Sequence, residues 1–286
     1  HMNKILTIDQ GTTSSRSIIF DINGDIEQVA QEEYPLIFPN DGWVEIDPED
    51  LYRSVTNTLG QLDLTNIKFG GITNQRETTI IWDKDTLKPV YNAIVWQDRR
   101  TSAYCSEIST DTNQSLVKQK TGLLIDSYFS ATKIKWILDN VDGARAKAEA
   151  GQLCFGTVDT YLMYRLSSGN IFKTDITNAS RTMLFNINTL SWDEELLKLF
   201  DIPKTLLPEV LHSDSCFGSL SELKDITIHA VLGDQQAALF GQGCLEKGQL
   251  KSTYGTGCFV MSNVGDKPIH SDDGLLTTIG FSLHGK

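Results

Sequence analysis

Short apolar runs recur along the chain at the length of buried strands, and amphipathic stretches separate them. Three strands are predicted at the start, over residues 4–8, 17–20 and 26–29. The pair Asn23-Gly24 between the second and third runs is a strong hairpin signal. A helix is predicted from Pro48 to about Leu62, because Asp47 suits the N-cap position and Pro48 suits the first helical turn.

The same alternation continues along the rest of the chain. Further strands are predicted over residues 67–73, 78–82, 153–155, 182–186, 227–232 and 276–283. Further helices are predicted over residues 99–108, 115–120, 130–138, 144–150, 158–166 and 193–200, and another begins at Asp234. Strands that alternate with helices in this way indicate the α/β fold class.

One short internal repetition suggests two domains. Residues 6–13 form a strand followed by a Gly-Thr turn, and residues 250–260 repeat that plan. We therefore expect a first domain over residues 1–243 and a second domain of similar build from residue 244. About forty residues follow that boundary, which rarely suffice to bury a separate core. We therefore expect the chain to be a truncated form of a larger protein.

Composition narrows the range of partners. The chain has 37 acidic against 25 basic residues, a net charge of −12, which argues against a nucleic-acid partner and against an anionic membrane surface. No apolar run approaches the roughly 18 residues of a membrane span. The five cysteines are scattered and form no C-x-x-C motif. We expect them to be reduced, buried thiols of a cytoplasmic protein.

The turn after the first strand is rich in groups that bind phosphate. Gly11 permits a tight turn close to a ligand. Backbone N–H groups and hydroxyls can donate to phosphate oxygens, and a guanidinium can bind phosphate through two hydrogen bonds. The candidate residues for these contacts are Thr12, Thr13, Ser14 and Arg16. Asp9, at the strand end, could hold Mg²⁺ through water. The alternative is an ordinary polar hairpin turn.

Two further segments carry groups suited to a small polar substrate. Arg76 and Glu77 lie between two apolar strands, and a bend in the backbone would let both reach one polyhydroxy ligand, where Arg donates and Glu accepts. The alternative is a surface ion pair. Trp96 could form an apolar wall against a carbon face, and Tyr128 precedes a predicted helix. The alternative for both aromatic residues is a place in the core.

A candidate base follows the apolar run that ends at Gly233. Asp234 stands at the start of the next predicted helix, where the helix dipole should keep its carboxylate ionised. Phosphoryl transfer to an alcohol needs a carboxylate that accepts the hydroxyl proton and orients the oxygen. The alternative is an N-cap aspartate without catalytic function.

Together these segments resemble the FGGY family of carbohydrate kinases. The matching stretches are Asp9–Arg16, Asn74–Thr78, Val95–Arg100, Gly156–Thr160, Thr177–Leu184, Gly233–Leu239 and Tyr254–Phe259. The family's first signature also fits from Tyr128 to Asn140, with Ser130, Lys133 and Trp136 in its pattern. Gln75-Arg76-Glu77 with Tyr254–Phe259 is similar to the members that phosphorylate glycerol and not to those that act on pentuloses or gluconate.

The resemblance implies a fold and a set of roles. The fold would be a ribonuclease H-like domain of the actin and hexokinase type, a mixed sheet flanked by helices, followed by the start of a second such domain. Asp234 would be the base. Arg76, Glu77, Tyr128 and Gln235 would hold glycerol hydroxyls, and Trp96 and Phe259 would line its carbon face. Thr12, Thr13, Ser14, Arg16 and Thr256 would meet the nucleotide phosphates, with Asp9 near Mg²⁺.

The implied reaction is transfer of the γ-phosphate of MgATP to glycerol, which gives sn-glycerol 3-phosphate. Family members run to about five hundred residues, so most of the nucleotide-binding domain is absent here. We therefore expect poor or no turnover, because phosphoryl transfer depends on positioning. The full-length enzyme is expected to be a homo-oligomer. The alternatives are a kinase for another small polyol or sugar, and a glycerol-binding fragment without catalysis.

Overall fold

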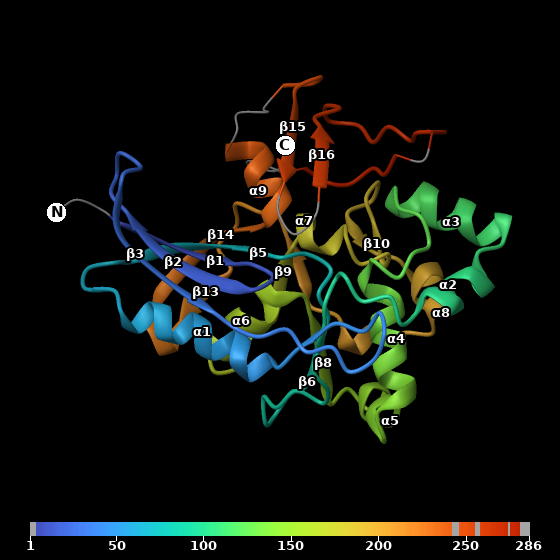
Figure 1. The fold of residues 1–286 in the computed structure, drawn as a ribbon, viewed down its shortest axis with the longest axis horizontal. Helices are drawn as coiled ribbons and strands as arrows, with labels where there is room; N and C mark the ends of the chain where they lie inside the picture. Colours follow the sequence, from blue (N-terminus) through green and yellow to red (C-terminus); the bar gives the residue numbers. More distant parts are fainter. Residues whose placement is uncertain (1–3, 242–245, 255–257, 274, 281–286) are drawn as a thin grey trace.

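A six-stranded mixed sheet organises the N-terminal part of the chain (Figure 1). The computed structural model describes residues 4–241, 246–254, 258–273 and 275–280. The strand order is β13-β14-β5-β1-β2-β3, in which β14, β5 and β1 are parallel and the other neighbours are antiparallel. Their bounds are β1 Ile5–Gln10, β2 Ser14–Phe20, β3 Ile26–Glu33, β5 Phe69–Asn74, β13 Gly218–Leu220 and β14 Ile226–Gly233.

Two helices cover one face of this sheet. Helices α1 (Pro48–Gly60) and α6 (Val158–Leu166) form the crossovers that lead to β5 and towards β14. Their apolar sides pack with alternate residues of the strands into one buried cluster, which includes Leu51, Tyr161 and, from β1, Leu6 and Ile8. Because Leu6 and Ile8 face the core, the side chains of Ile5, Thr7 and Asp9 lie on the opposite face.

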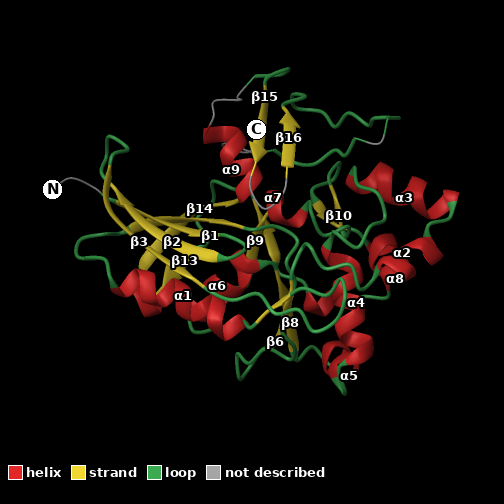
Figure 2. Ribbon diagram, in the orientation of Figure 1, coloured by secondary structure: helices red, strands yellow, loops and turns green. Residues whose placement is uncertain are grey.

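A second buried cluster lies beside the sheet, in the helical lobe of Figure 2. It is built from α2 (Ser102–Ile108), α3 (Asp111–Thr121), α4 (Ser130–Asn140), α5 (Ala144–Glu149) and α8 (Glu194–Phe200). Strands β6 (Ile80–Asp83) and β8 (Leu153–Gly156) pair between the two clusters, and their side chains contribute to both. The helical lobe is therefore anchored to the sheet through a two-stranded bridge.

The remaining elements are short. They are β4 Glu45–Ile46, β7 Ala93–Ile94, β9 Lys173–Asp175, α7 Ile176–Ala179, β10 Phe185–Asn186, β11 Ser191–Trp192, β12 Glu209–Leu211, α9 Asp234–Gly241, β15 Leu250–Tyr254, β16 Cys258–Ser262, and the 3₁₀ turns at Lys204–Leu206 and Ser221–Leu223. Strands β15 and β16 pair antiparallel, as β1 and β2 do. The predicted repetition of this plan is confirmed for the strands, and its turn lies outside the described residues.

Most predicted elements are confirmed, with α/β class and a mixed sheet. The predicted helix over 158–166 has the observed bounds, and Asp47 caps α1 by accepting from the backbone N–H of Glu49. The predicted strand over 182–186 is reduced to β10. The predicted strand over 276–283 is wrong for residues 276–280, which form no strand, and its remainder lies outside the described residues.

Two further predictions concern the domain boundary and the cysteines. The domain boundary at 243/244 falls within residues 242–245, outside the described part, and stays a prediction. Cys105 and Cys154 are buried thiols as expected, but Cys216 is exposed, because it lies in the loop that leads to the edge strand β13. In the described part of the chain, no helix has both the length and the apolarity that a membrane crossing requires.

Candidate active site

Three strand ends meet at one edge of the sheet. In the parallel register, Gln10 of β1 lies beside Asn74 of β5, and Asn74 lies beside Gly233 of β14. The phosphate turn follows β1, the segment Gln75-Arg76-Glu77 follows β5, and α9 follows β14. Segments far apart in the sequence therefore start from one line of backbone. In open α/β sheets, ligands bind in the crevice outside the carboxyl ends of the strands.

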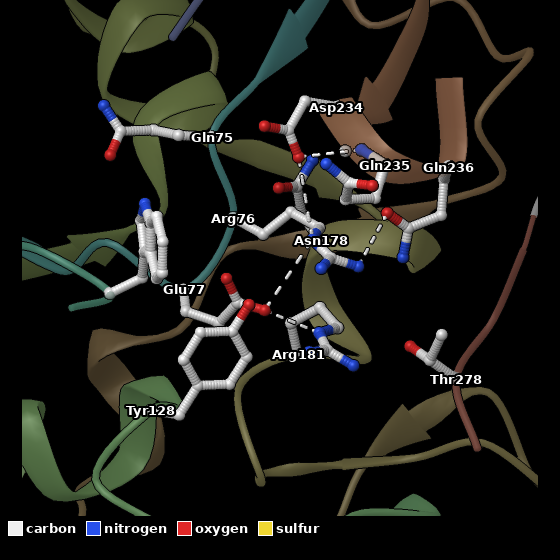
Figure 3. Close-up of polar contacts among 12 residues, drawn as sticks. Gln75, Arg76, Glu77, Tyr128, Asn178, Arg181, Asp234, Gln235, Gln236 and Thr278 are labelled. Atoms are coloured by element: carbon white, nitrogen blue, oxygen red, sulfur yellow. Dashed lines mark hydrogen bonds and ion pairs between the residues drawn. The ribbon is translucent and has the colours of Figure 1, made fainter. Parts of the chain in front are cut away.

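The backbone bends at Glu77, which brings the Arg76 and Glu77 side chains together (Figure 3). Glu77 has a φ of 63°, in the left-handed region that is uncommon for residues other than glycine. The Arg76 Nε and Glu77 Oε1 atoms lie 3.7 Å apart. The side chains are 4% and 1% exposed, so the surface ion pair considered as the alternative is wrong. This pair is buried at the strand edge.

Glu77 lies between two guanidinium groups. Besides its contact with Arg76, its Oε1 accepts a hydrogen bond of 2.6 Å from Nε of Arg181, which is 6% exposed. Both guanidinium groups approach Glu77 most closely at Oε1, and a carboxylate has about four acceptor sites, so the group can also accept a hydrogen bond from a ligand hydroxyl. Arg181 lies in one of the stretches that match the family, but the sequence assigned no role to this residue, because no spacing rule places Arg181 opposite Glu77.

Asp234 is the first residue of α9, and it faces Arg76. Its Oδ1 lies 3.7 Å from Arg76 Nε and accepts a 2.7 Å hydrogen bond from the backbone N–H of Gln235. A Cβ at Gly233 would lie 2.9 Å from Cγ of Arg76 and 2.7 Å from Oε1 of Gln236. A glycine at the end of β14 is therefore required for Arg76 to pass close to the strand and reach Asp234.

The pKa of Asp234 is set mainly by burial, and not by the helix dipole that the sequence suggested. Burial raises the pKa of Asp234 to about 6, the carboxylates of Glu77 and Asp9 act in the same direction, and Arg76 opposes them. The helix dipole therefore does not dominate, because the carboxylate is partly withdrawn from water and faces other acids. The group remains mostly ionised at pH 7 and is a stronger proton acceptor than an ordinary aspartate.

A buried polar network behind the site joins β5 to β14. Asp175 caps α7, and its Oδ2 accepts from the Thr177 hydroxyl at 2.6 Å. The Thr177 oxygen in turn accepts from the backbone N–H of Gly233 at 2.9 Å. Asn178 exchanges two hydrogen bonds with Asn74, of 2.9 and 3.1 Å. Gly233 directly precedes the candidate base, and Asn74 lies two residues before Arg76. The network thereby fixes these two positions relative to each other.

Trp96 and Tyr128 form an aromatic corner beside Glu77. Their ring centroids lie 5.8 Å apart in an edge-to-face arrangement, and the Trp96 indole N–H donates to the Thr12 hydroxyl at 3.0 Å. Both side chains are only partly buried, so neither is a fully enclosed core residue. Burial and the Glu77 carboxylate raise the pKa of Tyr128 to about 12, so its hydroxyl stays protonated and can donate.

The phosphate turn borders an open pocket. Its lining consists of Asp9, Gly11, Ser14, Arg16 and Gln31. Arg16 and Asp9 are cross-strand neighbours, and their charged atoms lie 3.7 Å apart. Burial raises the pKa of Asp9, and Arg16 opposes this. Ser14 accepts a hydrogen bond from Gln31, while the Thr13 side chain is exposed. Of the predicted phosphate residues, Thr12 and Thr13 therefore lie in the turn between β1 and β2, and Ser14 and Arg16 lie at the start of β2.

The donor set at Asp9 suits a hard divalent cation that keeps most of its own water. In the described part of the chain, no group of three or more His, Cys, Asp or Glu residues could hold a metal. Asp9 supplies one carboxylate, and Thr73 lies beside it in the parallel register. No described residue hydrogen-bonds the buried Thr73 hydroxyl. One carboxylate with phosphate and water oxygens is the usual Mg²⁺ environment at a nucleotide.

The remaining predicted residues lie towards the C-terminal hairpin. Gln235 is buried, and its side-chain oxygen accepts from the ammonium of Lys251 on β15. Gln236, which sequence reasoning missed, accepts from Arg76 Nη1 at 3.2 Å, and its position two residues after Asp234 was the available signal. Thr256 lies outside the described residues. Phe259 is on β16, and its side chain lies outside the described part as well.

Comparisons with known proteins decide the family. The model of the FGGY family of carbohydrate kinases, N-terminal domain, matches residues 4–241. The chain belongs to the FGGY family. Among curated FGGY relatives, the glycerol kinases of Alteromonas mediterranea and a Marinomonas species are 57% and 56% identical over 99% of this chain. The chain spans 59% of the length of each.

Solved FGGY structures show the same fold. A crystal structure of Plasmodium falciparum glycerol kinase with ADP superposes with a TM-score of 0.92 at 40% identity, over 98% of this chain and 58% of that one. A gluconate kinase from Lactobacillus acidophilus superposes with a TM-score of 0.81 at 22% identity, over 91% of this chain and 54% of that one. Both superpositions extend over more than nine-tenths of this chain, and the structure is α/β with a mixed sheet flanked by helices, so the predicted fold class is confirmed.

Proposed function

We propose that this chain forms the substrate side of an enzyme that phosphorylates glycerol, by transfer of the γ-phosphoryl group of ATP to a terminal hydroxyl. The product is sn-glycerol 3-phosphate. The observation that carries the proposal is the placement of the Asp234 carboxylate 3.7 Å from Arg76, beside Glu77 and next to the phosphate turn. The names of relatives at 57% and 56% identity support glycerol as the substrate.

The buried pair of Arg76 and Glu77 supplies complementary contacts for a polyol. A guanidinium donates hydrogen bonds and a carboxylate accepts them, so the two groups can donate to the oxygens of vicinal hydroxyls and accept their protons in hydrogen bonds. Tyr128 adds a protonated hydroxyl, and Trp96 adds an apolar wall for the carbon chain. We assign substrate binding to these four residues together with Gln235 and Phe259. A short three-carbon ligand suits a site in which so many groups converge.

Asp234 is proposed as the base. Its raised pKa, about 6, leaves it ionised at pH 7 and able to accept the proton of the attacking hydroxyl. Arg76 holds the carboxylate from one side, and the N–H of Gln235 holds it from the other. Thr12, Thr13, Ser14, Arg16 and Thr256 are proposed to bind the nucleotide phosphates. Mg²⁺ bound with ATP would neutralise charge on the phosphate oxygens, and we assign Asp9 to hold it.

A second candidate follows from the length of the match. The chain spans 59% of its glycerol kinase relatives, and in-line transfer depends on complete positioning of both substrates. A chain that binds glycerol and phosphates but turns over poorly is therefore the alternative to an active kinase. A kinase for another small polyol or sugar is the remaining candidate.

The test measures ADP release by the 286-residue chain with MgATP and, separately, glycerol, D-xylulose or gluconate, together with calorimetric binding of each compound. Glycerol-dependent release supports the proposal. Glycerol binding without release from a chain that circular dichroism shows to be folded supports the binding fragment. Release or binding with xylulose or gluconate, and not with glycerol, overturns the choice of substrate.

A further inference from the structure

Lys133 carries a buried positive charge inside the helical lobe. It is the fourth residue of α4 and is 1% exposed. Its ammonium donates to three consecutive backbone carbonyls, those of Ser127 at 2.5 Å, Tyr128 at 2.8 Å and Phe129 at 3.1 Å. An ammonium has three N–H donors, so this side chain is saturated by the segment that leads into its own helix.

This arrangement costs free energy. A cation in the first turn lies at the positive end of the helix dipole, and no side chain caps α4 at Phe129. Burial also lowers the pKa of Lys133, to about 8. An apolar residue would fill this volume without either penalty. The lysine contributes three hydrogen bonds to consecutive carbonyls of one segment.

That segment positions a proposed substrate residue. The backbone N–H of Tyr128 donates to Asp126 Oδ1 at 2.8 Å, so Tyr128 is held through its N–H as well as through its carbonyl. The hydroxyl of Ser130, next along the chain, donates to the Glu77 carbonyl at 3.0 Å. The Lys133 contacts therefore fix the backbone that places the Tyr128 ring beside Trp96 and Glu77 (Figure 3).

We propose that Lys133 is a positioning residue of the substrate site, whose ammonium fixes the Ser127–Phe129 backbone and thereby sets the place of the Tyr128 ring for binding of a small polyol. The inference rests on the proposed function and adds to it a residue that no ligand touches. Loss of the charge or of its hydrogen bonds weakens glycerol binding through Tyr128, while the phosphate turn, on the other side of Trp96, keeps its structure.

The groups that face Lys133 make its titration a usable readout. Glu77 from the bend after β5, Asp98 from the loop before α2, Cys105 from α2 and Asp126 from the loop before α4 all favour the charged ammonium, and desolvation opposes them. Burial raises the pKa of Cys105, away from that of Lys133. When pH rises through about 8, the neutral amine loses one of its three donors, and the hold on the segment weakens.

The test is calorimetric titration of glycerol into the 286-residue chain and its Lys133→Met, Lys133→Arg and Lys135→Met variants. Lys135 is the matched control, since it lies on the same helix and pairs with Asp139 outside the site. Lys133→Met is expected to raise the Kd for glycerol about tenfold, since it removes the charge-assisted hydrogen bonds that hold the Tyr128 backbone. Lys135→Met is expected to leave the Kd unchanged.

A double-mutant cycle separates positioning from a general effect on the fold. In a Tyr128→Ala background, the effect of Lys133→Met on glycerol binding is expected to disappear. Wild-type Kd should also rise above pH 8, while the Lys133→Arg variant shows no such rise. The comparison of pH profiles needs only wild type and Lys133→Arg, so it decides the inference if circular dichroism shows that Lys133→Met does not fold.

Three results overturn the inference alone: a Lys133→Met Kd within twofold of wild type, an undiminished effect in the Tyr128→Ala background, or the same pH profile in wild type and Lys133→Arg. Absence of glycerol binding by the folded wild-type chain overturns the proposed function and this inference together. The two failures are therefore distinguishable.

Discussion

The indole N–H of Trp96 donates a 3.0 Å hydrogen bond to the hydroxyl of Thr12, across 84 residues of sequence. The same indole ring packs against the Tyr128 ring in an edge-to-face arrangement. One side chain thus joins the turn proposed to bind phosphate to the corner proposed to bind the substrate. A kinase needs these two places at a fixed separation, because the reacting atoms must meet in line.

The first prediction concerns this bridge. Trp96→Phe keeps an aromatic wall but removes the N–H, so glycerol affinity should change little. Turnover in the complete enzyme, meaning this chain continued to the length of its relatives, should fall about two- to tenfold, as expected for one neutral hydrogen bond. Steady-state kinetics with glycerol and MgATP measure this.

Thr12→Val is the matched variant, because it removes the acceptor of the same bond. Its effect and that of Trp96→Phe should not add in the double variant. Additive losses would show that the two residues act separately.

The second prediction concerns Asp234. Asp234→Asn should lower kcat about 10²–10⁴-fold, the usual contribution of a general base, with glycerol affinity nearly unchanged. In the wild-type complete enzyme, the rate should fall as pH drops through about 6, because the raised pKa of Asp234 means that the base becomes protonated there. A pH–rate profile and the variant's kcat check both points, and an undiminished rate removes Asp234 from the mechanism.

The third prediction concerns the buried charges around Glu77. Arg181→Met removes the 2.6 Å partner of a carboxylate that is 1% exposed, and breaking a buried pair typically destabilises a protein by about 3–5 kcal/mol. Lys204→Met is the matched control, because its pair with Glu194 is exposed, and such pairs contribute about 0–1 kcal/mol. Urea unfolding of both variants measures the difference, and equal effects would contradict the structural role given to Arg181.

The fourth prediction concerns Asp159, which lies in the polar network near Asn74. Burial and the neighbouring Asp175 raise the pKa of Asp159 to about 7. The folded state therefore holds a proton that the unfolded state releases near pH 4, so this stabilisation is complete below that pH and is lost as pH rises towards 7. The free energy of unfolding of wild type relative to Asp159→Asn should fall over this range.

Asp83→Asn is the control for that measurement. Hydrogen bonds from Thr86 and Asp85 lower the pKa of Asp83, so its contribution to stability changes only below its unfolded pKa. The difference between wild type and Asp83→Asn should stay flat from about pH 5 to pH 7, above the range in which the unfolded aspartate titrates. A flat difference for Asp159→Asn as well would refute the raised pKa.

Local signals predicted most of the fold. The N-cap at Asp47 and the hairpin at Asn23-Gly24 depend on neighbours in sequence, and both are present. The short β9 and α7 were missed, because their stability comes from Asp175 and Asn178 hydrogen bonds to residues far away in the chain. The strand expected over 276–283 shows the opposite error in its described residues 276–280, which pair with no described strand and so form no ladder.

The sequence indicated which segments carry candidate site residues, but not the electrostatics among those residues. The bend that joins Arg76 to Glu77 was considered as a condition, and the structure supplies it at Glu77. The raised pKa of Asp234 comes from burial and from Glu77 and Asp9, whose closeness no spacing rule gives. Arg181 and Lys133 were visible only as members of motifs, since their contacts are set by tertiary packing.

The most direct test of the proposed glycerol site is calorimetric titration of glycerol into the 286-residue chain, compared with its Glu77→Gln variant. We predict one saturable site in the wild-type chain and a clear loss of affinity in the variant, because an amide replaces the carboxylate that accepts the hydroxyl protons. Absence of binding by a folded wild-type chain, or equal affinity in Glu77→Gln, would contradict the claim that the three strand ends form a glycerol site.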